Sequence, residues 1–218
     1  MTHTSPAPGN EPLDEPVTEA LNPAEALALA ERQQRAVGLA FAKPVAVLYL
    51  VWGVAWLVGF LLLWLGSSVD WMPLWVAGTS FAVLILAAIV TSAIVGSRIG
   101  RGVQGASATQ GIIYGLAWPI TGTAFAAVGM GLISQGMSTE LASLYFPSAY
   151  ALMVGIMYIL GGALWNARSQ FVLGVILMAI GSAAPFVGAP HNNLLMAVGG
   201  VAFLVGAAHF MLVLRKLR

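Results

Sequence analysis

The sequence predicts an all-α polytopic membrane protein: a six-transmembrane-helix bundle with a short cytoplasmic N-terminal helix. Of the 218 residues, 59% are hydrophobic and only 8% are charged. From residue 44 onward, long apolar runs alternate with short polar connectors. A water-soluble domain has about a quarter charged residues, because its surface must be hydrated. These observations together predict that most of the surface of this chain contacts lipid.

Two segments precede the apolar runs. Residues 1–21 are rich in Pro, Thr, Glu and Asn and contain too little apolar surface to offset the entropy of ordering, which predicts a disordered cytoplasmic tail. Asn22-Pro23-Ala24-Glu25 then matches a helix start, with an N-cap residue, a proline at the first helical position and an acid in the first turn. We predict a cytoplasmic or interfacial helix over residues 22–43, whose surface is either solvated or a docking face for the membrane or a partner.

Residues 44–218 form one predicted membrane domain. A helix needs about 20 apolar residues to cross about 30 Å of hydrocarbon, and six runs meet this requirement. The fourth and fifth runs are the shortest, so a re-entrant hairpin is the alternative there. Arg168 lies between them and would be expensive in lipid, which favours two full spans. The predicted spans are 44–66, 74–96, 111–133, 146–165, 171–189 and 194–214.

Basic residues predict the orientation in the membrane. All nine Lys and Arg residues lie before the first span, in the second or fourth connector, or after the sixth span. The connectors on the opposite side contain no Lys or Arg. Because positively charged connectors remain on the cytoplasmic side, we expect a multi-pass protein of the cell (plasma) membrane with both termini in the cytoplasm.

Glycines mark the third and fifth spans. In each span three glycines recur every seven residues, so they share one helix face and would let a neighbouring backbone approach closely. We interpret them as helix-packing positions and expect both spans in the packed interior. These glycines are Gly115, Gly122 and Gly129 in the third span and Gly174, Gly181 and Gly188 in the fifth.

Prolines in the same two spans indicate candidate ligand positions. A proline inside a helix removes one backbone donor and favours a kink, and transporters use the polar backbone that a kink frees. In the third span the candidates are Trp118, Pro119, Thr121 and Thr123. The candidates in the other spans are Ser182 and Pro185 in the fifth and His209, the only histidine well inside a span, in the sixth.

The sequence lacks the groups that most enzymes need. No Asp, Glu, Lys or Arg lies well inside a span, and the chain has no cysteine. Ser182 and His209 differ in predicted depth by roughly 9 Å, which is too far for the hydrogen bond of a serine protease. His209 also has no partners for a metal site. We therefore expect no enzymatic activity, catalytic residue, metal or cofactor, and without a basic stripe we expect no nucleic-acid binding.

Two hypotheses about function remain. The first is a non-enzymatic interaction, sensor or accessory subunit that lies in the lipid bilayer and binds a membrane or cytoplasmic protein, or a second copy of itself as a homo-oligomer. The second is a transporter or permease subunit for a neutral or hydrophobic small molecule, which would use the kinked third and fifth spans. The first is preferred because it requires fewer features that the sequence lacks.

Short motifs carry a resemblance to a group of membrane proteins. The segment from Trp165 to Gly174 and the segment Tyr49-Leu-Val-Trp52-Gly53 are similar to segments of small six-span actinobacterial membrane proteins without an assigned function. This resemblance implies a six-span topology and implies no site residues.

The first and fourth spans also share a pattern of glycine, aromatic residue and glycine. It occupies residues 53–59 in one span and 155–161 in the other. Since these two spans cross the membrane in opposite directions, an inverted repeat of three plus three spans would explain the pattern. Chance similarity is the preferred explanation, because glycine and aromatic residues are common in this chain.

Overall fold

The computed structural model describes residues 22–99 and 105–216. The described part is helical and contains no strand, which confirms the predicted all-α class. The tail predicted over residues 1–21 lies outside the described residues. The helices are α1 (Pro23–Ser68), α2 (Leu74–Ile99), α3 (Ala106–Ser134), α4 (Thr139–Leu164), α5 (Arg168–Val187) and α6 (Asn192–Lys216).

All six helices contain a stretch that is long and apolar enough to cross a membrane. Each of these stretches overlaps one predicted span, so the described chain has the length and composition of a multi-pass membrane protein. α4 and α5 have 26 and 20 residues, and Arg168 follows the tight turn between them as the first residue of α5. The fourth and fifth runs are therefore two separate helices of spanning length, as the cost of burying Arg168 in lipid predicted.

Residue contacts divide the chain into two units, residues 1–38 and 39–218. In the first unit, the described residues form the start of α1, and the side-chain oxygen of Asn22 accepts a hydrogen bond from the Ala24 N–H at 3.2 Å. This contact confirms the predicted helix start. Leu27 and Leu29 are 63% and 45% exposed, so this short helical segment presents apolar side chains on its surface.

The second unit contains the membrane helices. α1 does not end before Pro44, which lies inside the helix. A proline at this point removes one backbone hydrogen bond but leaves the bonds on either side, and an alanine-rich segment precedes it while an apolar span follows it. The predicted boundary between residues 43 and 44 is therefore a change of composition within one helix.

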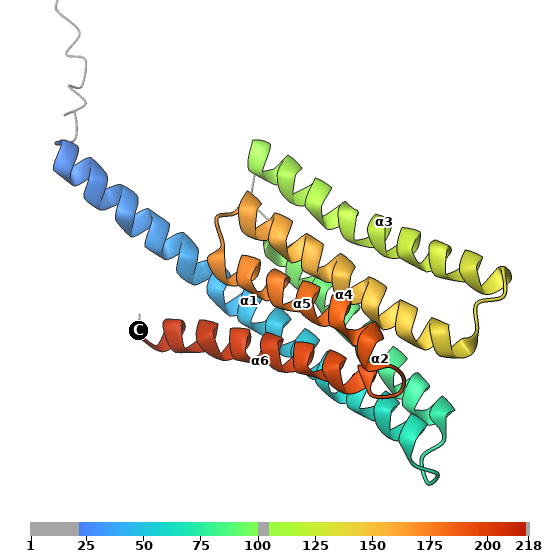
Figure 1. The fold of residues 1–218 in the computed structure, drawn as a ribbon. Coiled ribbons are helices and arrows are strands. Elements are labelled where there is room, and N and C mark those ends of the chain that lie inside the picture. Colours follow the sequence, from blue (N-terminus) through green and yellow to red (C-terminus); the bar gives the residue numbers. More distant parts are fainter. Residues whose placement is uncertain (1–21, 100–104, 217–218) are drawn as a thin grey trace, which may run out of the picture. The chain divides into compact units, whose positions relative to one another are not determined.

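Four helices of the second unit lie side by side in chain order, α3, α4, α5 and α6 (Figure 1). α1 packs against α6 near Gly53 and Gly200, and α2 packs against α1, where the Trp52 indole donates a hydrogen bond to Ser92 at 2.9 Å. α2 and α3 are the least covered helices. In their most apolar stretches only 6% of residues are buried, compared with 50% in α4.

This arrangement corrects one expectation about the third span. α3 contacts α4 and leaves most of its surface uncovered, so it lies at the edge of the group and not in its interior. α5 lies between α4 and α6 and is more covered, with a third of its apolar stretch buried. Glycine spacing predicted a helix face in both spans, but it did not show whether a helix of the same chain covers that face.

Candidate functional site

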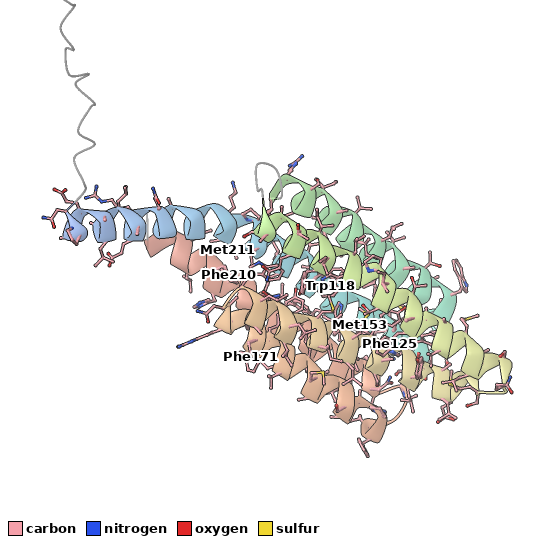
Figure 2. The ribbon with its side chains drawn as sticks, turned by 90° about the horizontal axis from the view of Figure 1, so that it is seen from above. Trp118, Phe125, Met153, Phe171, Phe210 and Met211 are labelled. Atoms are coloured by element: carbon pink, nitrogen blue, oxygen red, sulfur yellow. The ribbon has the colours of Figure 1, made fainter. Side chains whose placement is uncertain are left out.

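Trp118, a predicted ligand residue, lies in an aromatic cluster between α3 and α4. Its ring centre is 6.1 Å from that of Tyr114 and 5.9 Å from that of Tyr158, both in edge-to-face geometry. Figure 2 shows Trp118, Phe125 and Met153 in the middle of the helix group. Such aromatic pairs contribute about 0.5–1.5 kcal/mol each beyond their buried area. The contacts of Trp118 are therefore those of a packing residue.

The side chains of the other three candidates in α3 do not form a site with the Trp118 side chain. The Thr121 hydroxyl donates hydrogen bonds to the carbonyl oxygens of Ala117 at 2.6 Å and Trp118 at 3.2 Å, so its donor is used within its own helix. Pro119 and Thr123 are exposed. The structure therefore does not bring the predicted ligand residues of α3 into one site.

The candidates in α5 and α6 are also on the surface. Ser182, Pro185 and His209 are all exposed, and the ring contact of His209 is with its neighbour Phe210 at 6.0 Å. Among the described residues no hydrogen bond joins Ser182 to His209, and no group of three His, Asp or Glu side chains could hold a metal ion. The described helices thus present these three residues to their surroundings and not to one another.

Two of the three glycines of α5 mark a close contact with α4. A Cβ atom added to Gly174 would lie 2.7 Å from both the Gly155 carbonyl oxygen and the Ile159 amide nitrogen of α4. At Gly181 the added atom would lie 3.0 Å from the Cβ of Ala151. Only glycine allows the two backbones to come this close. Gly188 differs, because it ends α5 with a φ of 78° and has open space around it.

The glycines of α3 have three different environments. A Cβ on Gly129 would meet the Phe146 ring at 2.5 Å and the Tyr145 ring at 2.7 Å, so this glycine makes room for two aromatic side chains of α4. A Cβ on Gly122 would make ordinary contacts at 3.9 Å or more. Gly115 has nothing within 4 Å. The seven-residue spacing therefore does not define a single packing face in this helix.

Sequence reasoning missed the partners of these packing positions. Gly155 and Gly162 of α4 face Gly174 and Phe171 of α5, and Gly200 of α6 faces the backbone of α1. The glycine pair at 161–162 and the pair at 199–200 were the available signal. That signal shows a small residue, but only the folded chain shows which backbone approaches it.

A buried polar group near the start of α6 was also missed. Asn192 is fully buried, and its side-chain amide donates a hydrogen bond to the Ser143 carbonyl oxygen of α4 at 2.9 Å. Among the residues that the structure describes, its own side-chain oxygen has no hydrogen-bond partner, and neither does the buried hydroxyl of Ser148. Asn192 therefore ties α6 to α4, because an amide without that bond would be costly in an apolar interior.

A row of small residues follows the exposed surface of α3. It repeats every four residues, all of its members are exposed, and it extends over 20 residues, about 30 Å, or the thickness of the hydrocarbon core. Its three glycines have no atom within 4 Å of an added Cβ. We call this row the outer stripe, and its members are Gly111, Gly115, Pro119, Thr123, Ala127 and Gly131.

Larger side chains form a ridge next to the outer stripe. They also repeat every four residues and are strongly exposed, with Ile112, Leu116 and Ile120 at 63%, 55% and 66%. A ridge next to a shallow groove at this spacing is the shape that packs against another helix. Because a step of four residues advances about 40° around a helix, the row winds around α3, and its neighbouring members Gly115, Pro119 and Thr123 lie closest to one face.

No family model, curated protein or solved structure matches this chain. The resemblance to small six-span actinobacterial membrane proteins stays a prediction.

Proposed function

We propose that this chain is a non-enzymatic membrane interaction protein, a scaffold, sensor or accessory subunit that binds another transmembrane helix through the outer stripe of α3. One observation carries the proposal. At the crossings of α4 with α5 and of α1 with α6, glycines allow two backbones to touch, whereas no atom of the described residues lies within 4 Å of a Cβ added to Gly111, Gly115 or Gly131 of α3.

The physical argument concerns helix association in lipid. Lipid tails are as apolar as leucine, so burial of apolar surface does not drive helices together in a membrane. Close packing along a row of small residues does, because it allows many van der Waals contacts and weak backbone contacts. Gly115, Pro119 and Thr123 of the stripe, with the ridge beside them, provide such a surface on α3. The partner is a second copy of this chain or a helix of another membrane protein.

We place the protein in the plasma membrane with both termini in the cytoplasm. All nine basic residues lie before the first predicted span, in the second or fourth connector, or after the sixth span, and six crossings put these segments on the same side of the membrane. The positive-inside rule makes that side the cytoplasm. The helix start at Pro23 is then cytoplasmic, and its exposed Leu27 and Leu29 give a second contact surface for a soluble partner.

The test compares two glycine-to-leucine variants. Gly115→Leu adds a side chain where the single chain leaves open space, so the monomer should insert and fold normally while the stripe is blocked. Gly96→Leu is the matched control, because Gly96 of α2 is also exposed and open but lies outside the stripe. Two differently tagged copies are co-expressed and extracted into native-lipid nanodiscs, and co-isolated copies and other proteins are quantified by mass spectrometry.

We expect Gly115→Leu to lower recovery of the partner about tenfold, which corresponds to a loss of about 1.4 kcal/mol. Gly96→Leu should leave recovery unchanged. Deletion of residues 1–42 shows which of the two contact surfaces binds the partner. A partner that binds the stripe is still recovered, whereas a partner that binds the N-terminal helix is lost. Equal recovery with Gly115→Leu and Gly96→Leu would contradict binding through the outer stripe.

A further inference from the structure

An open cavity of about 360 Å³ lies on the surface beside the turn between α4 and α5. Most of its lining is apolar, and two of its residues, Phe171 and Val172, are 46% and 54% exposed. Phe171 lies at the outer edge of the helix group, away from Trp118 and Phe125 (Figure 2). The lining residues are Gly162, Ala163, Asn166, Arg168, Phe171 and Val172.

The turn holds one cation at the rim of this apolar cavity. Asn166 has a φ of 50°, a conformation that asparagine tolerates better than most residues, and so it ends α4. The Ala167 N–H then donates to the Gly162 carbonyl oxygen at 2.8 Å, which closes the turn. Arg168 follows as the first residue of α5. Its position is therefore set by backbone hydrogen bonds and not by a free loop.

The floor of the cavity is closed by the contact of α4 with α5. A Cβ added to Gly162 would lie 2.7 Å from the Phe171 amide nitrogen, so the two backbones touch there. Arg168 is exposed, and the structure records no ion pair for it within residues 22–99 and 105–216. The cavity thus combines an apolar wall with one cation that has no recorded acidic partner, at the end of two spanning helices.

We propose that this cavity binds an anionic phospholipid, with the phosphate of its headgroup at the Arg168 guanidinium and one acyl chain against Phe171 and Val172. A guanidinium binds phosphate through paired N–H donors. Basic pockets between transmembrane helices on the cytoplasmic side bind acidic lipid headgroups. A free phosphate would use the cation but leave the apolar wall without a partner, so a lipid matches the whole cavity.

The experiment measures which lipids stay with the full-length protein. Protein in mixed micelles of phosphatidylglycerol and phosphatidylcholine is analysed by native mass spectrometry, and the bound ratio of the two lipids is compared with the ratio in the micelle. Arg168→Gln removes the charge, and Ala163→Trp fills the apolar side but keeps the charge. Arg98→Gln is the matched control, an exposed arginine at the last turn of α2 that does not line the cavity.

We expect the unmodified chain to enrich phosphatidylglycerol. Arg168→Gln should lower this enrichment about fivefold, the size expected for one cation near an anionic headgroup. Ala163→Trp should lower it by a similar factor. Arg98→Gln should retain the enrichment. Circular dichroism and gel filtration identify a variant that fails to fold, and Ala163→Leu then replaces Ala163→Trp. An equal loss with Arg98→Gln, full retention with the variants at position 163, or displacement by millimolar inorganic phosphate would overturn the proposal.

Discussion

At the scale of single residues, glycine has opposite meanings in α3 and α5. Gly174 lies against the backbone of α4, and Gly115 lies in open space, although both belong to a seven-residue repeat. A methyl group at the first position must displace backbone atoms, because two of them would be 2.7 Å away. A methyl group at the second position meets nothing, and alanine is the better helix former.

This difference predicts the stability of two alanine variants. Gly174→Ala should lower the free energy of unfolding by about 1–3 kcal/mol, the usual cost of overpacking an interior. Gly115→Ala should leave it unchanged or raise it by up to about 1 kcal/mol. Unfolding by sodium dodecyl sulfate in mixed micelles, followed by tryptophan fluorescence, measures both. An equal effect of the two substitutions would contradict a close contact of α4 with α5 at Gly174.

At the scale of helices, tyrosine hydroxyl groups of α3 and α4 hold the two helices together. Tyr114 of α3 donates a hydrogen bond to the Met157 carbonyl oxygen at 2.7 Å. Tyr150 and Tyr145 of α4 donate to the carbonyl oxygens of Gly122 at 3.0 Å and Phe125 at 3.1 Å. These three bonds are spaced along the interface, so α3 is attached to the group mainly along one side.

Replacement of all three tyrosines by phenylalanine should loosen α3. Hydrogen bonds between membrane helices contribute about 0.6 kcal/mol each on average, so the triple variant should lose roughly 2 kcal/mol of the stability of this contact. Hydrogen–deuterium exchange in nanodiscs should then become faster in α3. Exchange in α5 is the internal control and should not change. Faster exchange throughout the protein would instead mean that the substitutions destabilise the whole fold.

At the scale of the whole molecule, the distribution of charge predicts which end of each helix is in the cytoplasm. The chain has no cysteine, so single cysteines can be introduced and labelled without removing others. Ser107 and Gln135 are exposed residues at opposite ends of α3. In intact cells a maleimide that cannot cross the membrane should label Gln135→Cys and not Ser107→Cys, and after permeabilisation it should label both. The reverse pattern would contradict cytoplasmic termini.

The contacts of the glycines also bear on the inverted repeat. If the first three helices matched the last three, α1 would correspond to α4, α2 to α5 and α3 to α6. Gly53 of α1 faces α6, however, whereas its counterpart Gly155 in α4 faces α5 and not α3. Matching residues therefore contact helices that do not correspond, which supports chance similarity between the first and fourth spans.

The sequence by itself determined the helical class, the six spans and the helix start at Pro23. Each of these depends on local properties: the length of an apolar run, the cost of a charge in lipid and the chemistry of a cap. The candidate site was less predictable. The sequence indicated Trp118, Thr121 and Thr123 as neighbours along the chain, but it did not contain the direction of each side chain relative to α4.

Only the tertiary structure decided which small residues are covered. Gly174 and Gly115 have the same chemistry and similar spacing, and the difference between them comes from a second helix that packs on one and not on the other. The same holds for Arg168, whose role depends on the cavity that the turn between α4 and α5 places beside it. Apolar length is a property of one segment, whereas a covered or open face depends on pairs of segments that are distant in the chain.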